Sequence, residues 1–450
     1  FSFDLDTKLT TRASIGATVD YKLTPNDNLS FSFQYANNDA MVYGRRMNFQ
    51  ILRVEPDDFT PTSTRGTGTV TVQGGVYSRN GTTYMPSLSY RHDGTVWKSE
   101  VGAGFSHATG HDRNVSKGFF NSTFATLFDV TISFQDINYL RPAAISVADT
   151  TTGAPVNPYV LSNYSLSTGN DQELDGVDTK RSAYANLRRD FYGRVPVAVK
   201  AGLDFRQSIR DKRRSNKGFS FVGADGVART ADDNASVILD ESISQRIPPY
   251  GFPRVQWMDN VKYYDLYKAN PGYFTVNEVA AHNNATNNSK HAEEVISSAY
   301  IRGDVQFFDR RLKLVGGVRA EQTNVKAEGR LLDPTRNFQR DASGKVILGP
   351  TGTAQLIAPA GTLAAVQLTT IDRGLRARKE YLRWFPSINA SFNVRDNLIA
   401  RAGYYWSVGR PNFAQYAGAL NLPDTERPPS TGNRISVANA GIKAWSAKTT

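Results

Sequence analysis

Alternating strands that meet at short polar turns recur five times along the chain. In the clearest example, residues 298–307 alternate between apolar and charged side chains, and residues 312–321 do the same after a turn. Successive side chains of a strand point to opposite faces, so this hairpin has one apolar and one charged face. The pattern predicts ten long strands, two for each turn. The five turns are centred near Asn26, Asp93, Gly193, Arg310 and Asp396.

The segments between hairpins are much longer than the turns within them. Short turns at one end and long polar loops at the other are typical of outer-membrane β-barrels. We therefore expect an all-β fold, a transmembrane antiparallel β-barrel segment that forms one partial domain over residues 1–450. Alternating stretches near 70–77 and 119–134 are assigned to extensions beyond the membrane. Long extracellular loops are expected at about 43–81, 110–180, 206–291, 328–380 and 411–440.

Composition agrees with a barrel and excludes other classes. Hydrophobic residues make up 40% of the chain, and no run approaches the roughly 20 apolar residues of a membrane helix. The chain has no cysteine, which excludes disulfides and cysteine-ligated metals. Its 53 basic and 42 acidic residues give a net charge of +11. These charges are spread over strands and loops without a basic helix, so anionic outer-membrane lipid and lipopolysaccharide are expected partners, and nucleic acid is not.

Several segments resemble the barrel of TonB-dependent outer-membrane receptors. The resemblance implies a 22-stranded barrel filled by an N-terminal plug, which imports a scarce nutrient such as a siderophore, an oligosaccharide or a vitamin. It also implies energy supplied by the TonB complex of the inner membrane. We expect the plug to lie outside this chain, which would then be the barrel portion of a receptor in the outer membrane of a Gram-negative bacterium. The segments are SAYIRGDVQFF at 298–308, and 311–323, 381–389, 409–415 and 439–445, with a similar insert at 266–274.

Charged side chains within the strands are the first candidate site. Arg or Lys on the lipid face of a barrel costs about 2–4 kcal/mol at the bilayer midplane, so these residues are expected to face the lumen. There they form cross-strand ion pairs of the wall, contact the plug or line a solute path, and the first two roles are favoured. The set comprises Lys200, Asp204, Arg302, Asp304, Arg319, Glu321 and Arg401.

Aromatic side chains of the longest loop are the second candidate site. Such rings can stack on sugars or flat ligands, or can pack the loop into a stable cap. Separately, Trp384 and Trp406 are expected at similar heights on adjacent strands, in an aromatic belt. Pro86 and Pro386 lie within strands and require a bulge or a projecting rim. The ligand-contact candidates are Tyr250, Phe252, Trp257, Tyr263 and Tyr264.

Catalysis and cofactor binding have no support in the sequence. His107 and His111 are four residues apart, but at a strand end this spacing favours a solvated pair over a metal site. No nucleotide-binding glycine loop or nucleophile turn occurs in the expected setting, so neither enzymatic activity nor a cofactor is expected. Two alternatives to a receptor remain: a passive porin-like channel with the same strands, and a soluble β-rich surface-binding module.

Overall fold

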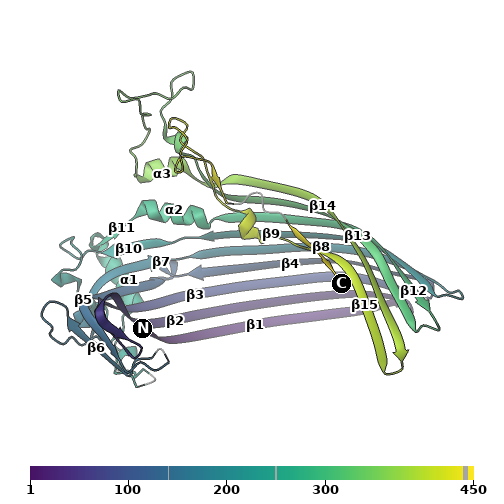
Figure 1. The fold of residues 1–450 in the computed structure, drawn as a ribbon, viewed down its shortest axis with the longest axis horizontal. Coiled ribbons are helices and arrows are strands. Elements are labelled where there is room, and N and C mark those ends of the chain that lie inside the picture. The colour runs from purple at the N-terminus through teal and green to yellow at the C-terminus, as the bar shows by residue number, and fades with distance from the viewer. Residues whose placement is uncertain (140, 249–250, 439–443) are drawn as a thin grey trace.

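Ten long antiparallel strands and one short strand form a curved wall (Figure 1). The computed structural model describes all residues except 140, 249–250 and 439–443. Each wall strand pairs with the wall strand that follows it in the chain, and among the described residues the first strand pairs only with the second and the last only with β15. The all-β antiparallel fold and the ten-strand count are therefore confirmed. The wall comprises β1 (Ser2–Thr24), β2 (Asp27–Thr60), β3 (Ser63–Asp93), β4 (Trp97–Arg113), β8 (Leu174–Phe191), β9 (Val197–Arg214), β12 (Lys290–Phe307), β13 (Leu312–Leu332), β14 (Thr370–Arg395), β15 (Leu398–Gly409) and β18 (Trp445–Thr449).

All five tight turns lie at one end of this wall, as the sequence predicts. Hydrogen bonds join each turn to the next hairpin: Asp93 N–H donates to the carbonyl of Asn26 at 2.8 Å, and Asp190 N–H donates to that of Val96 at 2.9 Å. Gln306 N–H donates to Pro196, and Asn393 N–H donates to Arg311. The backbone groups at this rim are thereby paired across the wall, which fixes the heights of neighbouring hairpins relative to one another.

The register keeps each alternate set of side chains on a single face. Ile301 lies opposite Val318, and Arg302 lies opposite Lys200. Ile301 is 54% exposed and Leu398 is 53% exposed, whereas the neighbouring Val305, Leu314 and Val318 are half-buried. Within the part of the chain that the structure describes, no second protein layer buries this band. One apolar row in continuous register is Tyr21, Leu29, Tyr90, Val101, Ala185, Leu203, Ala299, Ala320 and Trp384.

Both strand prolines lie where one neighbouring ladder is interrupted. Pro86 pairs with Phe33 of β2, but β3 and β4 have no pairing between Tyr84 and Ser87. The register is the same on both sides of this gap, so the expected bulge is replaced by a simple break. Pro386 lies just beyond Ser387, where pairing of β14 with β15 ends. A missing N–H is therefore tolerated at both positions.

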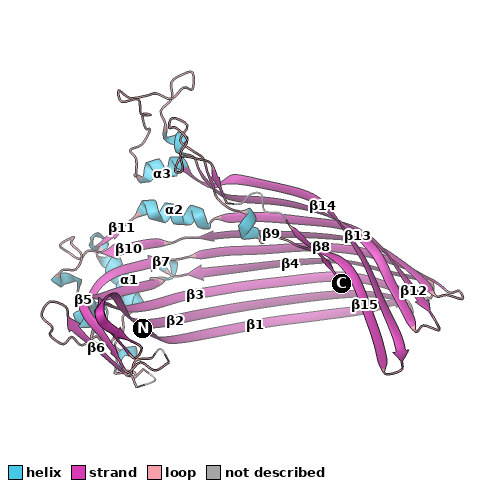
Figure 2. Cartoon of the chain, in the orientation of Figure 1, coloured by secondary structure: helices cyan, strands magenta, loops and turns pink. Residues whose placement is uncertain are grey.

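The end opposite the turns is a separate layered structure rather than a set of irregular loops. The stretch 43–81 is strand on both sides of a turn at 61–62, and the outer half of β3 pairs with β5 instead of β4. Helices and short strands complete this end in Figures 1 and 2. The additional strands are β5 (Ser122–Gln135), β6 (Ala144–Asp149), β7 (Ser165–Asp171), β10 (Lys217–Phe221), β11 (Phe274–Val276), β16 (Leu420–Asn421) and β17 (Ser436–Val437). The α-helices are α1 (Asn260–Ala269), α2 (Glu278–Asn288), α3 (Leu363–Thr369) and α4 (Phe413–Tyr416).

A hydrophobic core holds this outer end together. Met47 and Phe49 of β2 are buried, and they belong to the same alternate set as the half-buried Leu29 and the exposed Phe31. The outer-end core therefore continues the apolar face of the wall, and protein covers that face only at this end. In the described residues, no helix is both long and apolar enough to cross a membrane.

Removal of Trp257 should open the outer end selectively. Trp257 is 0% exposed within this core, and truncation of a buried Trp costs about 3–5 kcal/mol. We expect Trp257→Ala in the full-length protein to make residues 110–290 more sensitive to protease while the turn end stays resistant. Trp384→Ala is the control, because that side chain is 57% exposed. Equal sensitivity of the two variants would contradict this assignment of the core.

Candidate functional site

The polar face of the wall carries ion pairs between residues two apart on the same strand. Side chains at i and i+2 share a face of a strand, so opposite charges with this spacing can meet. Arg302 donates to Asp304 at 2.9 Å, and Arg319 donates to Glu321 at 2.7 Å. The same spacing occurs in Arg188 and Asp190 and in Asp204 and Arg206. We refer to these eight residues as the charged wall.

Strand pairing links these units across the sheet. Asp304 is buried and accepts from Arg188 of β8 at 3.4 Å in addition to Arg302. Arg319 also reaches Asp204 of β9, at 3.3 Å, across the intervening β12. Glu321 receives a further bond from Arg410, which follows β15. The structure thus joins five of the predicted residues into two neighbouring networks, one between β8 and β12 and the other from β9 to the end of β15.

Lys200 and Arg401 belong to the same face but to neither network. Lys200 lies in register between Arg188 and Arg302, so three cations stand side by side on β8, β9 and β12. Neither Lys200 nor Arg401 forms an ion pair with another described residue. Arg401 and Lys313 contribute to a separate open pocket of about 510 Å³. These cations leave positive charge available to a partner on this face.

Two tyrosines cover glycines of adjacent strands on the charged face. Tyr300 lies over Gly202 and donates to Asn186 at 2.7 Å. Tyr184 lies over Gly102 and donates to Glu100 at 3.0 Å. A Cβ at Gly202 would lie 2.6 Å from the Tyr300 ring, and one at Gly102 would lie 2.7 Å from the Tyr184 ring. Glycine is therefore required at both positions by the close approach of an aromatic ring.

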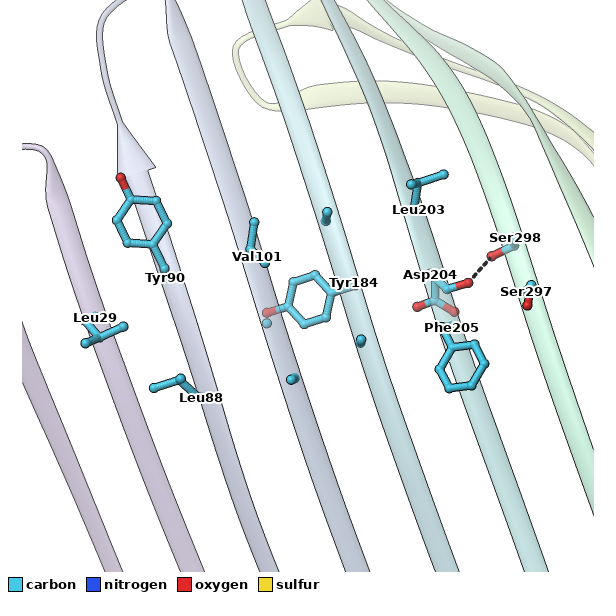
Figure 3. A pocket seen from close by; sticks show the side chains of 14 residues that line it. Leu29, Leu88, Tyr90, Val101, Tyr184, Leu203, Asp204, Phe205, Ser297 and Ser298 are labelled. Carbon is cyan, nitrogen blue, oxygen red and sulfur yellow. Dashed lines mark hydrogen bonds between the residues drawn. The ribbon is translucent and has the colours of Figure 1, made fainter.

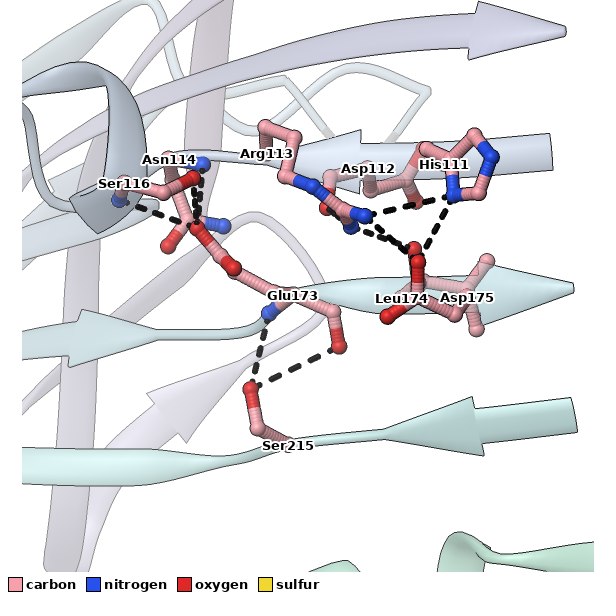
Figure 4. Close-up of polar contacts among 9 residues, drawn as sticks. All are labelled: His111, Asp112, Arg113, Asn114, Ser116, Glu173, Leu174, Asp175 and Ser215. Carbon is pink, nitrogen blue, oxygen red and sulfur yellow. Dashed lines mark hydrogen bonds and ion pairs between the residues drawn. The ribbon is translucent and has the colours of Figure 1, made fainter.

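A polar cluster joins β4 and β8 at the outer end (Figure 4). Asp175 accepts from His111 at 2.7 Å and from Arg113. Glu173 accepts from the backbone N–H of Asn114 and from Ser116; burial raises the pKa of Glu173, but these hydrogen bonds outweigh it and hold the pKa below its usual range. Because these groups satisfy one another, the cluster fixes the start of β8 rather than binding a metal. Among the described residues, no group of three or more His, Asp or Glu side chains could hold a metal ion.

A polar pocket of about 330 Å³ opens beside this cluster. Helix α2 forms one side through Thr286, and Ser289 follows the helix. Arg213 pairs with Asp372 at 3.3 Å within the lining. With both charges present, this pocket can hold a small polar molecule that offers donors and acceptors together. Its lining also contains Glu173, Asp175, Arg214, Ser215 and Ala285.

Two of the five aromatic ligand-contact candidates are buried in the outer-end core, and two more pack against neighbouring rings. Trp257 and Tyr263 are both 0% exposed in the outer-end core, so neither can contact a ligand. Phe252 stacks on Phe3 with ring centroids 4.2 Å apart, and Tyr264 packs against Phe120 at 5.5 Å. These rings therefore stabilise the outer end. The fifth candidate, Tyr250, and most of the motif at 439–445 lie outside the described residues.

Sequence reasoning missed Arg188, Asp190, Arg206 and Arg410 as members of the polar networks, although Arg206 lies only two residues after the predicted Asp204. The signal for Arg188 and Asp190 is the i, i+2 pairing of opposite charges, which also occurs in two of the chosen hairpin strands. Arg410 has no such signal, because its contact with Glu321 depends on how the chain turns after β15. Trp384 and Trp406 are exposed at similar heights on one face, as predicted.

The strand register defines an amphipathic wall of the β-barrel type. No protein-family model matches the chain, and no curated protein matches its sequence. Among solved structures it is similar to Fiu, the ferric-catecholate import receptor of E. coli K12, with 10% identity and a TM-score of 0.42 over 99% of this chain and 54% of that one. It is also similar to BauA, the ferric preacinetobactin receptor of Acinetobacter baumannii. The identity is 11% and the TM-score is 0.33 over 99% of this chain and 50% of BauA. The siderophore receptor PiuA of the same species is 8% identical, with a TM-score of 0.27 over 89% of this chain and 49% of that one.

The chain thus spans about half the length of these receptors. The assignment of its fold therefore depends on the strand pairing and register described above.

Replacement of Gly202 should test the tyrosine–glycine contact. Gly202→Ala forces Tyr300 away from Asn186 and should destabilise the folded full-length protein by about 1–3 kcal/mol, as measured by denaturant unfolding in detergent. Gly303→Ala on β12 is the matched control, because a Cβ there meets nothing within 4 Å. If Gly202→Ala unfolds at the same denaturant concentration as Gly303→Ala, the contact does not constrain the wall.

Asp171 should make the outer end less stable as pH rises. Burial, and then the neighbouring Glu173 carboxylate, raise the pKa of Asp171 to about 6. The folded protein therefore holds this proton more tightly than the unfolded chain, whose Asp titrates near about 4. The stabilisation is present below pH of about 4 and is lost as pH rises to about 6.

Asp171→Asn should remove this slope and raise stability at neutral pH. Denaturant unfolding, monitored by tryptophan fluorescence at several pH values between 4 and 7, would measure the free energy of unfolding of both proteins. Identical pH dependence of the variant and the parent protein would contradict the assignment.

Proposed function

We propose that this chain is the barrel portion of a TonB-dependent import receptor of the bacterial outer membrane. The main observation in support of this proposal is that one continuous wall has an apolar face that no other described part of the chain covers and an opposite face that carries ion pairs. Leu203 is 62% exposed and Ile15 is 66% exposed, and an exposed band of this extent is unusual for a soluble protein. Lipid would cover this band, and the charged wall would face the lumen.

The charged wall supports contact with a plug. Its eight residues pair with one another, but Lys200 and Arg401 on the same face have no ionic partner among the described residues. A polar plug domain that fills the lumen would supply partners for such cations and would exclude water from the half-buried pairs. We assign Lys200 and Arg401 to plug contact and the other five predicted residues to the wall itself.

The outer end supports a role in ligand capture. Its buried core makes the long insertions rigid, and the pocket beside α2 offers both charges to a small polar solute. Energy coupling through the plug and the TonB complex would then drive uptake. The nutrient proposed is a siderophore, an oligosaccharide or a vitamin, and the activity proposed is transport without catalysis.

Matched substitutions on one strand test which face meets lipid. Val318 and Val315 are both half-exposed in β13, but Val318 lies on the apolar face opposite Ile301 and Val315 lies on the charged face opposite Asp304. Arg on the lipid face costs about 2–4 kcal/mol at midplane, so Val318→Arg should lower the heat-modifiable, folded fraction of full-length protein in outer membranes several-fold. Val315→Arg should remain near the parent level.

Equal folding of the two variants, or recovery of the protein in a detergent-free soluble fraction, would contradict the membrane assignment. Uptake assays with ferric siderophores, oligosaccharides and cobalamin then separate a receptor from a passive channel. Uptake that an uncoupler abolishes supports the receptor, and uptake that persists supports the porin-like alternative.

A further inference from the structure

A furrow crosses the apolar face of the wall where small residues lie between large ones (Figure 3). Ala103, Ala183 and Ala185 form its floor on β4 and β8. Larger side chains stand on either side, Leu88 and Tyr90 of β3 on one and Leu203 and Phe205 of β9 on the other. The resulting pocket has a volume of about 610 Å³, within the range of small-ligand sites.

The furrow continues along the strands toward the tight turns. A second pocket of about 510 Å³ shares Val101, Ala185 and Leu203 with the first and extends over Ala201 and Leu187. Along the two pockets, none of the described side chains that point to the apolar face is charged. The two adjoining pockets are lined mainly by apolar side chains, which suits the hydrocarbon chain of a lipid.

Cationic side chains border the furrow at both ends. Arg181 and Arg189 of β8 belong to the same alternate set as Ala183 and Ala185, and both are exposed. Their separation of eight positions spans about 26 Å along a strand, or roughly 20 Å of bilayer depth once the strand tilt is included. Arg189 lies over Trp97, 5.1 Å from its ring centroid, as expected at a membrane interface.

The outer rim is net cationic and has groups to receive a phosphate. Arg181 donates one bond to Gln207 at 2.9 Å, which leaves further guanidinium N–H groups. Lys326 and Arg378 lie on the same rim with two carboxylates: Glu293, 4.0 Å from Lys326, and Glu380, which shares the face of Arg378, so three cations outnumber two acids. Arg binds phosphate well because its donors can engage two oxygens at once.

We infer that the furrow binds lipopolysaccharide, with one acyl chain between Tyr90 and Leu203 and a phosphate at Arg181. This inference rests on the proposed membrane function, since the apolar face must meet lipid. The shape of the furrow accounts for the hydrocarbon chain, and the cationic outer rim accounts for the anionic headgroup. The furrow and the charged wall lie on opposite faces of the same strands, and Asp204 contributes to the lining of the furrow as well as to the charged wall.

The test compares lipid retained by full-length protein purified from outer membranes in mild detergent. Arg181→Gln removes the phosphate contact, and Ala185→Leu fills the furrow without adding polarity. Each should lower the lipopolysaccharide retained per folded protein at least about fivefold, whereas Arg181→Lys should restore much of it. Ala320→Leu is the control, because Ala320 lies on the same face outside the furrow.

Heat-modifiable migration of every variant separates this inference from the proposed function. If the parent protein does not insert, the membrane assignment itself fails. If all variants insert and retain equal lipopolysaccharide, the furrow is not its site. Loss of phosphatidylglycerol instead of lipopolysaccharide in Arg181→Gln would overturn the assigned occupant.

Discussion

Unbroken strand register is the constraint on which the whole wall depends. Side chains alternate with a period of two, so a slip of one residue would transfer every charged group to the apolar face. Register shifts in the wall ladders lie at the turns, as between Lys22 and Thr24 and between Asn393 and Arg395, or toward the outer end, as between Ile51 and Arg53. Even the break at Pro86 leaves the register unchanged. The two faces can therefore differ in chemistry over ten strands.

The charged face reinforces that register through pairs that are specific in geometry. Individual exposed ion pairs contribute little to stability, but Asp304 is buried and shared by two arginines. A slip between β8 and the strands beside it would separate Asp304 from Arg188, so this buried carboxylate would keep only Arg302, the partner on its own strand. The contact of Tyr300 with Gly202 also favours this register, because only this register places the ring above a residue without a side chain.

Much of the wall could be predicted because its signals are local. Alternation and turn residues within about 25 positions predict hairpins such as 298–321, and the i, i+2 charges predict shared faces. The outer end could not be predicted in this way, because its core joins residues as distant as Met47 and Phe274. Trp257 and Tyr263 show the difficulty: an aromatic-rich loop has the same composition whether its rings face a ligand or one another. Only their burial decides between these roles.

The contrast between hairpins and outer end also has a consequence for assembly. Each tight turn brings together residues close in sequence, so the entropy lost on closing a hairpin is small. The outer-end core instead requires segments separated by more than 200 residues to meet, as the rings of Phe3 and Trp257 do, with centroids 6.2 Å apart. Contacts of such long sequence separation form slowly. The wall can therefore grow hairpin by hairpin from the turn end, and the outer end can become rigid only after synthesis has passed β11.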